Sequence, residues 1–206
     1  MKLYGHPMST CTRKVLTTLA EKGHEAQFVL IDLGTGQQKS PDYVAKHPFG
    51  VVPYLEDDGF SMYESRAIIR YLDAKLPGNK LIPSDLPSLG RMEQWLSVEQ
   101  SYFTPHCMAI VMEMLMKQMR GGGKPDMDKV NKGRDQAAKA LDVVDRALRS
   151  QAYLAGDTFS LADISWLPYL QYLSVTPQGT LITERPFVKS WWQRISTRPS
   201  WKKVNG

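Results

Sequence analysis

The sequence has little cysteine, and its two thiols, Cys11 and Cys107, form neither a CxxC pair nor a disulfide framework. This usage is typical of proteins from a reducing compartment. No apolar run approaches the ~20 residues that a membrane-crossing helix needs. The first residues, MKLYG, have the pattern of a strand and do not resemble the apolar core of a signal peptide. We therefore expect a soluble, cytoplasmic protein with no membrane partner.

The chain also lacks any concentrated basic segment. Lysine and arginine exceed acidic residues by 26 to 21, a net charge of +5, but the longest basic run is Lys202-Lys203. Nucleic-acid partners select clustered positive charge, so we expect none here, and we expect no bound metal. Hydrophobic residues make up 42% of the sequence, which is ordinary for a globular protein with a real core.

The first part of the chain alternates strand and helix patterns. Lys2–Tyr4 and Ala26–Ile31 are predicted strands, and an amphipathic helix between them ends at Lys22-Gly23. Two strands joined by a helix-length crossover indicate a parallel βαβ unit. A short hairpin that turns at Asp58-Gly59, followed by a helix, completes a βαβ-ββα layout. This order is that of a thioredoxin-like domain.

The remainder of the chain is predicted to be helical. Three prolines mark residues 77–87 as a linker. Helical periodicity is predicted over Arg91–Met119 and Met127–Ser150, which are separated by a GGGKP break. Ser160 followed by Asp163 has the spacing of a capping box that opens a further helix. The predicted fold class is therefore an α/β domain followed by an all-α domain.

The stretch from His47 to Tyr71 contains a proline step, a hairpin and a helix start. Ser65 stands where the N-cap of that helix is predicted. A helix N-terminus presents unpaired N–H groups and a partial positive charge, which suits a carboxylate or a phosphate, and Glu64 beside it can hold an amine. The pair suits an α-amino-acid head group. The alternative is that Ser65 only caps the helix and Glu64 only complements its dipole.

Pro53 favours the interpretation as a binding segment. A proline cannot donate to a sheet ladder, and it therefore belongs at a sheet edge or in a special turn. If the bond between Val52 and Pro53 is cis, the Val52 N–H and C=O turn outward and can pair with the backbone of a peptide ligand.

Several spaced motifs in this order resemble the cytosolic glutathione transferases. PFG-x-VP followed by ESRAI resembles the segment that grips the γ-glutamyl end of glutathione in that family. MKLYG-x-x-MS and KSP…HPFG-x-VP resemble the phi class, and YLAG-x-x-FSLAD resembles the capping-box region of the helical domain. The resemblance covers nearly the full length and implies a homodimer with glutathione as cosubstrate. It implies a thioredoxin-like, glutathione-binding domain (1–76), a linker (77–87) and a helical domain that contributes the hydrophobic substrate pocket (88–206).

Ser9 lies between the first strand and the first helix, where the resemblance places the serine of the phi class. A free thiol has a pKa of ~8.5, and lowering it by about two units requires roughly 2.7 kcal/mol in favour of the thiolate. A hydrogen bond to a charged acceptor supplies about 1.5 to 3 kcal/mol, and a helix N-terminus adds some tenths to one. Ser9 Oγ can therefore act as a donor that stabilises the thiolate of bound glutathione. The alternative is that Ser9 only caps the helix.

For the glycyl carboxylate of glutathione, the resemblance points to Gln38 and Lys39. Lysine supplies a point charge for a carboxylate, although Lys39 can equally be a solvated loop residue. The phi pattern usually has His-Lys at these two positions and a glutamine where this chain has Val51. Both departures remove a polar contact, so we expect weaker binding of glutathione than is usual for the class. The predicted glutathione-binding residues are Gln38, Lys39, Val52, Pro53, Glu64 and Ser65.

The resemblance also implies a pocket for the second substrate, an apolar electrophile, between the two domains. Methionine-rich walls adapt to varied apolar ligands, although such stripes are more often core. The predicted lining is Met8, Thr10, Phe103, Cys107, Met108 and Val111. Cys11 lies on the apolar side of the first helix and is predicted to be buried and structural, whereas Arg13 can face either the site or solvent.

The sequence thus predicts a glutathione transferase of phi-like type that detoxifies apolar electrophiles, with Ser9 as its catalytic residue. Two alternatives remain open. One is a non-catalytic binder with the same fold that carries hydrophobic ligands or partner proteins. The other is a glutathione-dependent peroxidase. Reduction by a thiol of the protein itself is disfavoured, because there is no CxxC motif and Ser9 stands where a reactive cysteine would be.

Overall fold

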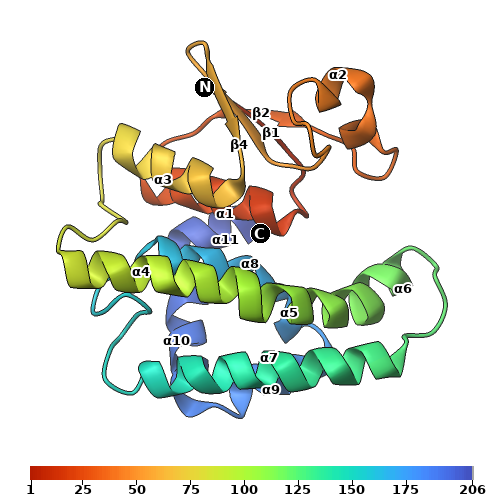
Figure 1. Ribbon diagram of the computed structural model, residues 1–206, viewed down its shortest axis with the longest axis vertical. Helices are drawn as coiled ribbons and strands as arrows, with labels where there is room; N and C mark the ends of the chain where they lie inside the picture. The colour runs from red at the N-terminus through yellow and green to blue at the C-terminus, as the bar shows by residue number, and fades with distance from the viewer. Residues whose placement is uncertain (206) are drawn as a thin grey trace. The chain divides into compact units, whose positions relative to one another are not determined.

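The computed structural model describes residues 1–205, and the chain divides into two compact units (Figure 1). The first unit consists of residues 1–81 together with the last helix of the chain, and the second consists of residues 82–198. The predicted fold class, a thioredoxin-like α/β domain and an all-α domain, is confirmed.

The first unit contains a four-stranded mixed sheet in the order β2-β1-β3-β4. β1 and β2 are parallel, with Lys2 opposite Gln27, and β3 is antiparallel to both of its neighbours. The predicted βαβ unit and hairpin are therefore present. The elements are β1 (Lys2–Gly5), α1 (Thr10–Glu21), β2 (Gln27–Leu30), the 3₁₀ turn η1 (Gln37–Lys39), α2 (Pro41–Val44), β3 (Tyr54–Asp57), β4 (Phe60–Tyr63), α3 (Ser65–Lys75) and α11 (Pro199–Asn205).

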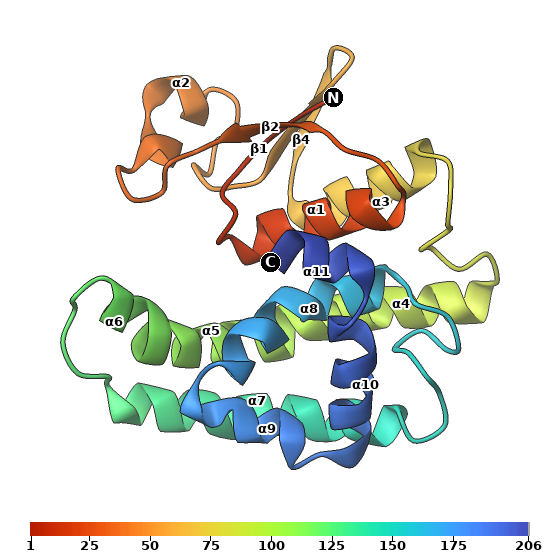
Figure 2. The same ribbon diagram turned by 180° about the vertical axis from the view of Figure 1, so that it is seen from behind.

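Both faces of this sheet bury apolar side chains. Leu3 and Leu55 pair across β1 and β3 and are fully buried, and α1 and α3 lie together along one face of the sheet (Figures 1 and 2). Successive side chains of a strand point to opposite faces, so Tyr4 and Tyr54 turn the other way. A smaller core cluster there contains Ile31, Tyr43, Val52 and Tyr54.

The last helix, α11, returns to the first unit, although the resemblance assigns residues 88–206 to the helical domain. α11 packs along α1 in both views (Figures 1 and 2), and its Trp201 is 1% exposed. An amphipathic pattern shows that a helix has an apolar face, but it does not show which domain covers that face.

The second unit is helical apart from an isolated bridge between Tyr153 and Gly156. Its first helical stretch begins at Leu86, inside the predicted linker. Asp85 caps this helix, because its Oδ1 accepts a hydrogen bond from Ser88 N at 2.9 Å. Pro87 lies in the first turn, where the N–H that a proline lacks would have no partner within the helix. The elements are α4 (Leu86–Val98), the π-turn η2 (Glu99–Phe103), α5 (Thr104–Val111), the π-turn η3 (Met112–Met116), α6 (Lys117–Met119), α7 (Met127–Ala147), α8 (Leu161–Ser174), η4 (Pro177–Gly179), α9 (Thr180–Thr183) and α10 (Pro186–Ser196).

The first π-turn, η2, explains how the long helix predicted over Arg91–Met119 continues through Pro105. A proline inside an α-helix removes one i→i−4 hydrogen bond, and a π-turn re-routes the bonds around such a position. The amphipathic helix predicted from Met127 is also present as α7, and the residues predicted on its inner face are buried: Val130, Ala137, Ala140, Leu141, Val144 and Leu148.

The predicted capping box at the start of α8 is present and extends into the core. Asp163 Oδ2 accepts hydrogen bonds from Ser160 N at 2.9 Å and from Ser160 Oγ at 3.0 Å. Its other oxygen, Oδ1, accepts from Leu154 N at 3.0 Å and from Trp191 Nε1 at 2.9 Å. Asp163 therefore connects the start of α8 to α10 and to the loop before α8.

Among residues 1–205, no helix is long and apolar enough to cross a membrane.

Candidate functional site

Ser9 is the N-cap of α1, which begins where the loop leaving β1 ends. Its Oγ accepts a hydrogen bond from Thr12 N at 3.2 Å, and its own N–H donates to His6 O at 2.9 Å. A hydroxyl has one donor and two acceptor positions. The cap therefore uses Oγ as an acceptor and leaves the hydroxyl hydrogen able to donate to an anion. The first turn of α1 contains no acidic residue that would offset its positive end.

Arg13, whose role the sequence leaves open, is 8% exposed and faces the Ser9 loop. Its Nε donates to Pro7 O at 2.7 Å, and its Nη1 donates to Asn205 Oδ1 at 2.8 Å. Cys11 differs from its prediction, because it is half-buried and not fully buried. It lies in the first turn of α1, where fewer neighbours cover a side chain.

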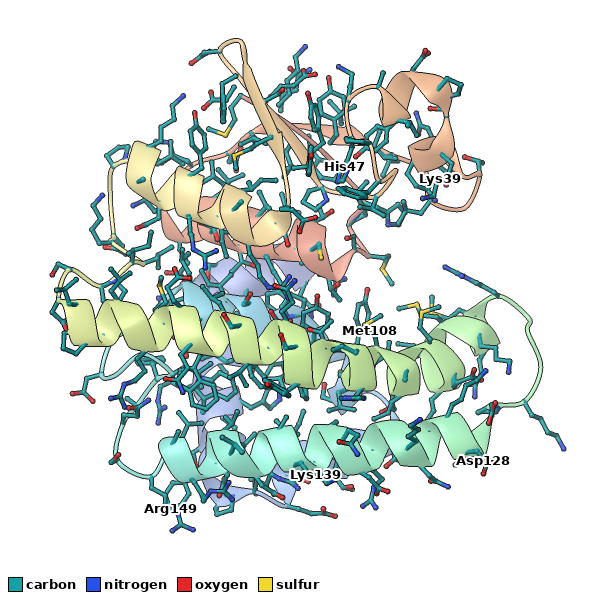
Figure 3. All side chains as sticks on the ribbon, in the orientation of Figure 1. Lys39, His47, Met108, Asp128, Lys139 and Arg149 are labelled. Atoms are coloured by element: carbon teal, nitrogen blue, oxygen red, sulfur yellow. The ribbon has the colours of Figure 1, made fainter. Side chains whose placement is uncertain are left out.

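Gln38 and Lys39 lie on η1 and are joined to the HPFG segment. Lys39 Nζ donates to Phe49 O at 3.0 Å, and Gln38 Oε1 is buried without a hydrogen-bond partner. Gly50 allows this approach: its φ is +56°, and a Cβ at that position would lie 2.8 Å from Gln38 O. Figure 3 shows Lys39 and His47 in the loop region that carries α2.

The Val52–Pro53 peptide bond is cis. Val52 is buried in the small core cluster, and the neighbouring Val51 carbonyl accepts a hydrogen bond from Tyr43 Oη at 2.9 Å.

The start of α3 differs from the sequence prediction by one residue. Ser65 is predicted as the N-cap, but Glu64 occupies that position and Ser65 is the first helical residue, 3% exposed. No side chain caps α3, so the alternative in which Ser65 only caps the helix is wrong. Glu64 has φ +73°, a conformation that is uncommon for non-glycine residues and that clusters at functional sites. Sequence patterns carry no signal for such a backbone conformation at a glutamate.

His47 is fully buried in an aromatic cluster with Tyr43, Phe49 and Tyr63. Its ring stacks on Tyr63 with centroids 4.7 Å apart, and Nδ1 has no hydrogen-bond partner. Burial lowers the pKa of His47, while the charges of Glu64 and Lys39 act on the same ring in opposite directions. His47 thus lies near one predicted anchor for each end of glutathione.

The assignment of three side chains to the electrophile pocket is wrong, because they belong to the core of the second unit. Phe103, Cys107 and Val111 are all fully buried. Phe103 stacks on Trp166 with centroids 4.5 Å apart, and Cys107 Sγ donates to Tyr169 O at 3.6 Å. Burial raises the pKa of the Cys107 thiol, which keeps it protonated and unreactive.

The remaining predicted lining residues are at least partly accessible. Met8 is 40% exposed, and Thr10 and Met108 are half-buried. Among residues 1–205, no three His, Cys, Asp or Glu side chains gather as a metal site would require.

Two family models match the chain: "Glutathione S-transferase, N-terminal domain" over residues 1–74 and "Glutathione S-transferase, C-terminal domain" over residues 103–199. The chain is 41% identical to glutathione S-transferase 3 of Zea mays, over 99% of this chain and 92% of the relative. The crystal structure of glutathione transferase F7 from Populus trichocarpa is similar, with a TM-score of 0.94, 42% identity and coverage of 99% and 97%. The structure of glutathione S-transferase I from maize in complex with an atrazine glutathione conjugate has a TM-score of 0.90, 34% identity and coverage of 98% and 95%.

Proposed function

Because the chain belongs to the glutathione S-transferase family, resembles its phi class and is an enzyme of this kind, we propose that Ser9 holds the thiol of glutathione as a thiolate for attack on apolar electrophiles. The thiol proton passes to solvent, the sulfur forms the new bond to carbon, and the leaving group departs with the bonding electron pair. The maize relative, whose structure holds an atrazine glutathione conjugate, supports this assignment.

The observation that carries the proposal is the orientation of Ser9 at the start of α1. Its Oγ is fixed as an acceptor by Thr12 N, so its hydrogen is directed away from the helix. A thiolate at that point would receive this hydrogen bond and would also face the positive end of a 12-residue helix. Together these two interactions are of the size needed to lower a thiol pKa by about two units.

The ends of glutathione have separate proposed anchors. The uncapped N-terminus of α3 suits the α-carboxylate of the γ-glutamyl group, and Glu64 suits its ammonium. Lys39 and Gln38 suit the glycyl carboxylate, and the Val52 backbone suits the peptide between the two ends. Lys39 donates to the Phe49 carbonyl, which holds its Nζ at one place and leaves two further N–H bonds for a ligand.

Met8, which precedes Ser9 and is partly exposed, is the proposed contact for the electrophile, together with Thr10. The contact of Met108 with the electrophile stays a prediction. A methionine suits varied apolar substrates because its side chain is flexible and polarizable.

The test compares conjugation of an aryl halide by the wild type, by Ser9→Ala and by Ser97→Ala, which changes an exposed serine of the second unit. We expect Ser9→Ala to lose up to about 25-fold in kcat/KM at about pH 7, because a return of the thiol pKa from about 6.5 towards ~8.5 lowers the thiolate fraction by up to that factor. Calorimetry should show glutathione still bound, since its anchors are elsewhere. Full turnover by Ser9→Ala would exclude this role, and absence of glutathione binding to the wild type at millimolar concentration would favour the non-catalytic binder.

We also propose that the chain forms a homodimer, as the resemblance implies. Phe49 and Tyr102 are each 65% exposed, and Tyr102 borders an apolar cavity of about 360 Å³ lined by Val98, Ala140 and Val143. An aromatic side chain that projects from one copy suits such a cavity on a second copy, in an interface related by a twofold axis. Sedimentation should show Phe49→Ser and Tyr102→Ala shifting the wild-type dimer towards monomer. Val175→Ser, at another exposed apolar position, should leave the dimer unchanged.

The cytoplasmic location expected from the sequence is part of this proposal. Fractionation of cells that express the chain checks it, and recovery from a secreted or membrane fraction would contradict it.

A further inference from the structure

Hydrogen bonds join both ends of α11 to α1. Ser200 Oγ donates to Glu21 at the end of α1, and Asn205 accepts from Arg13 near its start. The two helices are therefore antiparallel. Lys203 adds an ion pair with Glu25 at 2.5 Å. Asn205 contacts the N-terminal part of α1, which begins next to Ser9.

Arg13 joins Asn205 to the loop before Ser9. Its Nη1 donates to Asn205 Oδ1 at 2.8 Å, its Nε donates to Pro7 O at 2.7 Å, and Nη2 lies 3.9 Å from Met8 Sδ. The guanidinium is planar and rigid, so fixing one nitrogen orients the others. Asn205 thereby sets the position from which Arg13 holds Pro7.

The bond from Arg13 anchors Pro7 through its carbonyl, since a proline has no N–H that could anchor it to the protein. The rest of the loop is tied to His6, whose carbonyl accepts from Ser9 N at 2.9 Å and whose Nδ1 accepts from Met8 N at 3.1 Å. His6 therefore holds the backbone of Met8 and Ser9, and Arg13 holds Pro7. A shift of Pro7 would move Ser9, only two residues further along the chain.

We propose that Asn205 is a positioning residue for the reaction: through Arg13 and the Pro7 carbonyl, it holds the Ser9 hydroxyl where it donates to the glutathione thiolate. The inference rests on the proposed function of Ser9. A hydrogen bond that stabilises a charged reacting atom loses strength with displacements of about half an ångström, so the residues that fix the donor affect the reaction without touching the substrate.

The experiment measures the pKa of the glutathione thiol bound to the enzyme, by ultraviolet absorbance of the thiolate and by the pH profile of kcat/KM. The variants are Asn205→Ala, Arg13→Lys, the two combined, Ser9→Ala and, as a matched control on the same helix, Lys203→Ala. Lys203→Ala removes an exposed ion pair to Glu25 and leaves the contact with Arg13 in place.

We expect Asn205→Ala to raise the thiol pKa by about half a unit to one unit, which lowers kcat/KM about three- to tenfold below that pKa. At alkaline pH its rate should return to that of the wild type, which a general loss of structure would not produce. In the Arg13→Lys background, Asn205→Ala should add little, because the two residues act in series. Lys203→Ala should match the wild type.

An unchanged thiol pKa in Asn205→Ala, while Ser9→Ala loses activity, would overturn this inference and leave the proposed function intact. Additive effects of Asn205→Ala and Arg13→Lys would overturn the route through Arg13. Full activity of Ser9→Ala would overturn the role of Ser9 and, with it, this inference.

Discussion

The hydroxyl of Ser9 has two hydrogen-bonding roles that use different atoms. Its oxygen accepts a hydrogen bond from Thr12 N and so caps the start of α1, and its hydrogen remains for a ligand. The two interpretations that the sequence leaves open for Ser9, cap and donor, are therefore compatible. The same is not true of Ser65, which is inside its helix and caps nothing.

At the residue scale, Gly50 is the first position where a small change should affect glutathione binding. We expect Gly50→Ala to cost about 3 kcal/mol of unfolding free energy, since it adds backbone strain and pushes against Gln38 O. KM for glutathione should rise several-fold, because Gln38 and Lys39 move. Chemical unfolding and steady-state kinetics measure both effects.

Gly59→Ala is the matched control, because Gly59 also has positive φ, at +84°, but a Cβ there meets no atom within 4 Å. Its cost should be about 1–2 kcal/mol, with an unchanged KM. Equal effects of the two variants would contradict a role for the close approach at Gly50.

His47 should make the protein sensitive to mild acid. Burial lowers its pKa below the ordinary 6.5, so the unfolded chain binds a proton more readily than the folded one. The resulting stability is present above pH 6.5 and is lost as the pH falls through the lowered pKa. Each unit of lowering corresponds to about 1.4 kcal/mol.

We expect His47→Phe, which keeps a ring to stack on Tyr63, to remove this loss. Unfolding free energies measured about one unit above and about one unit below pH 6.5 should differ less in the variant than in the wild type. His24→Phe controls for the loss of any imidazole. A wild-type difference that persists in full in His47→Phe would contradict the prediction.

At the element scale, the start of α8 is held by the buried Asp163 carboxylate, which accepts four hydrogen bonds. We expect Asp163→Ala to cost at least about 3 kcal/mol, because it leaves three buried N–H donors, of Leu154, Ser160 and Trp191, without their acceptor. Asp85→Ala, which removes the exposed cap of α4, should cost only about 1 kcal/mol.

Urea unfolding measures this difference. If Asp163→Ala does not accumulate as folded protein, Ser160→Ala, which removes only the Oγ donor, should still fold with a smaller loss. Equal costs at Asp163 and Asp85 would show that the buried connections of Asp163 add nothing to capping.

Most elements follow from local sequence patterns. The hairpin was predicted from Asp58-Gly59, and both residues have the positive φ that such a turn requires. The sequence places the start of α3 one residue too late. Capping preferences favour a serine over a glutamate and cannot detect the φ of Glu64. Phe103, Cys107 and Val111 were misassigned because helical periodicity is the same for a core face and for a pocket wall.

At the scale of the whole molecule, the chain leaves the first unit at residue 81 and returns to it at residue 199. The sequence predicts both domains but not this return, because nothing local distinguishes the partner of the last helix. The contact between Asn205 and Arg13 was equally invisible, since it joins residues 192 positions apart.

Because α11 belongs to the first unit, the stability of that unit should depend on the buried Trp201. We expect Trp201→Ala to cost about 3–5 kcal/mol and to increase hydrogen exchange of backbone amides in residues 1–81, while residues 82–198 keep their protection. Mass spectrometry of peptides from the exchanged protein measures this. Loss of protection confined to residues 82–198 would contradict the assignment of α11 to the first unit.

The helix that closes the first unit is synthesised only after the whole of the second unit. When residues 1–81 have emerged from the ribosome, the whole of the second unit must still be translated before α11 emerges. The unit that begins first is thus completed after the second unit, and the Ser9 loop acquires the support of Arg13 and Asn205 only when synthesis reaches Asn205.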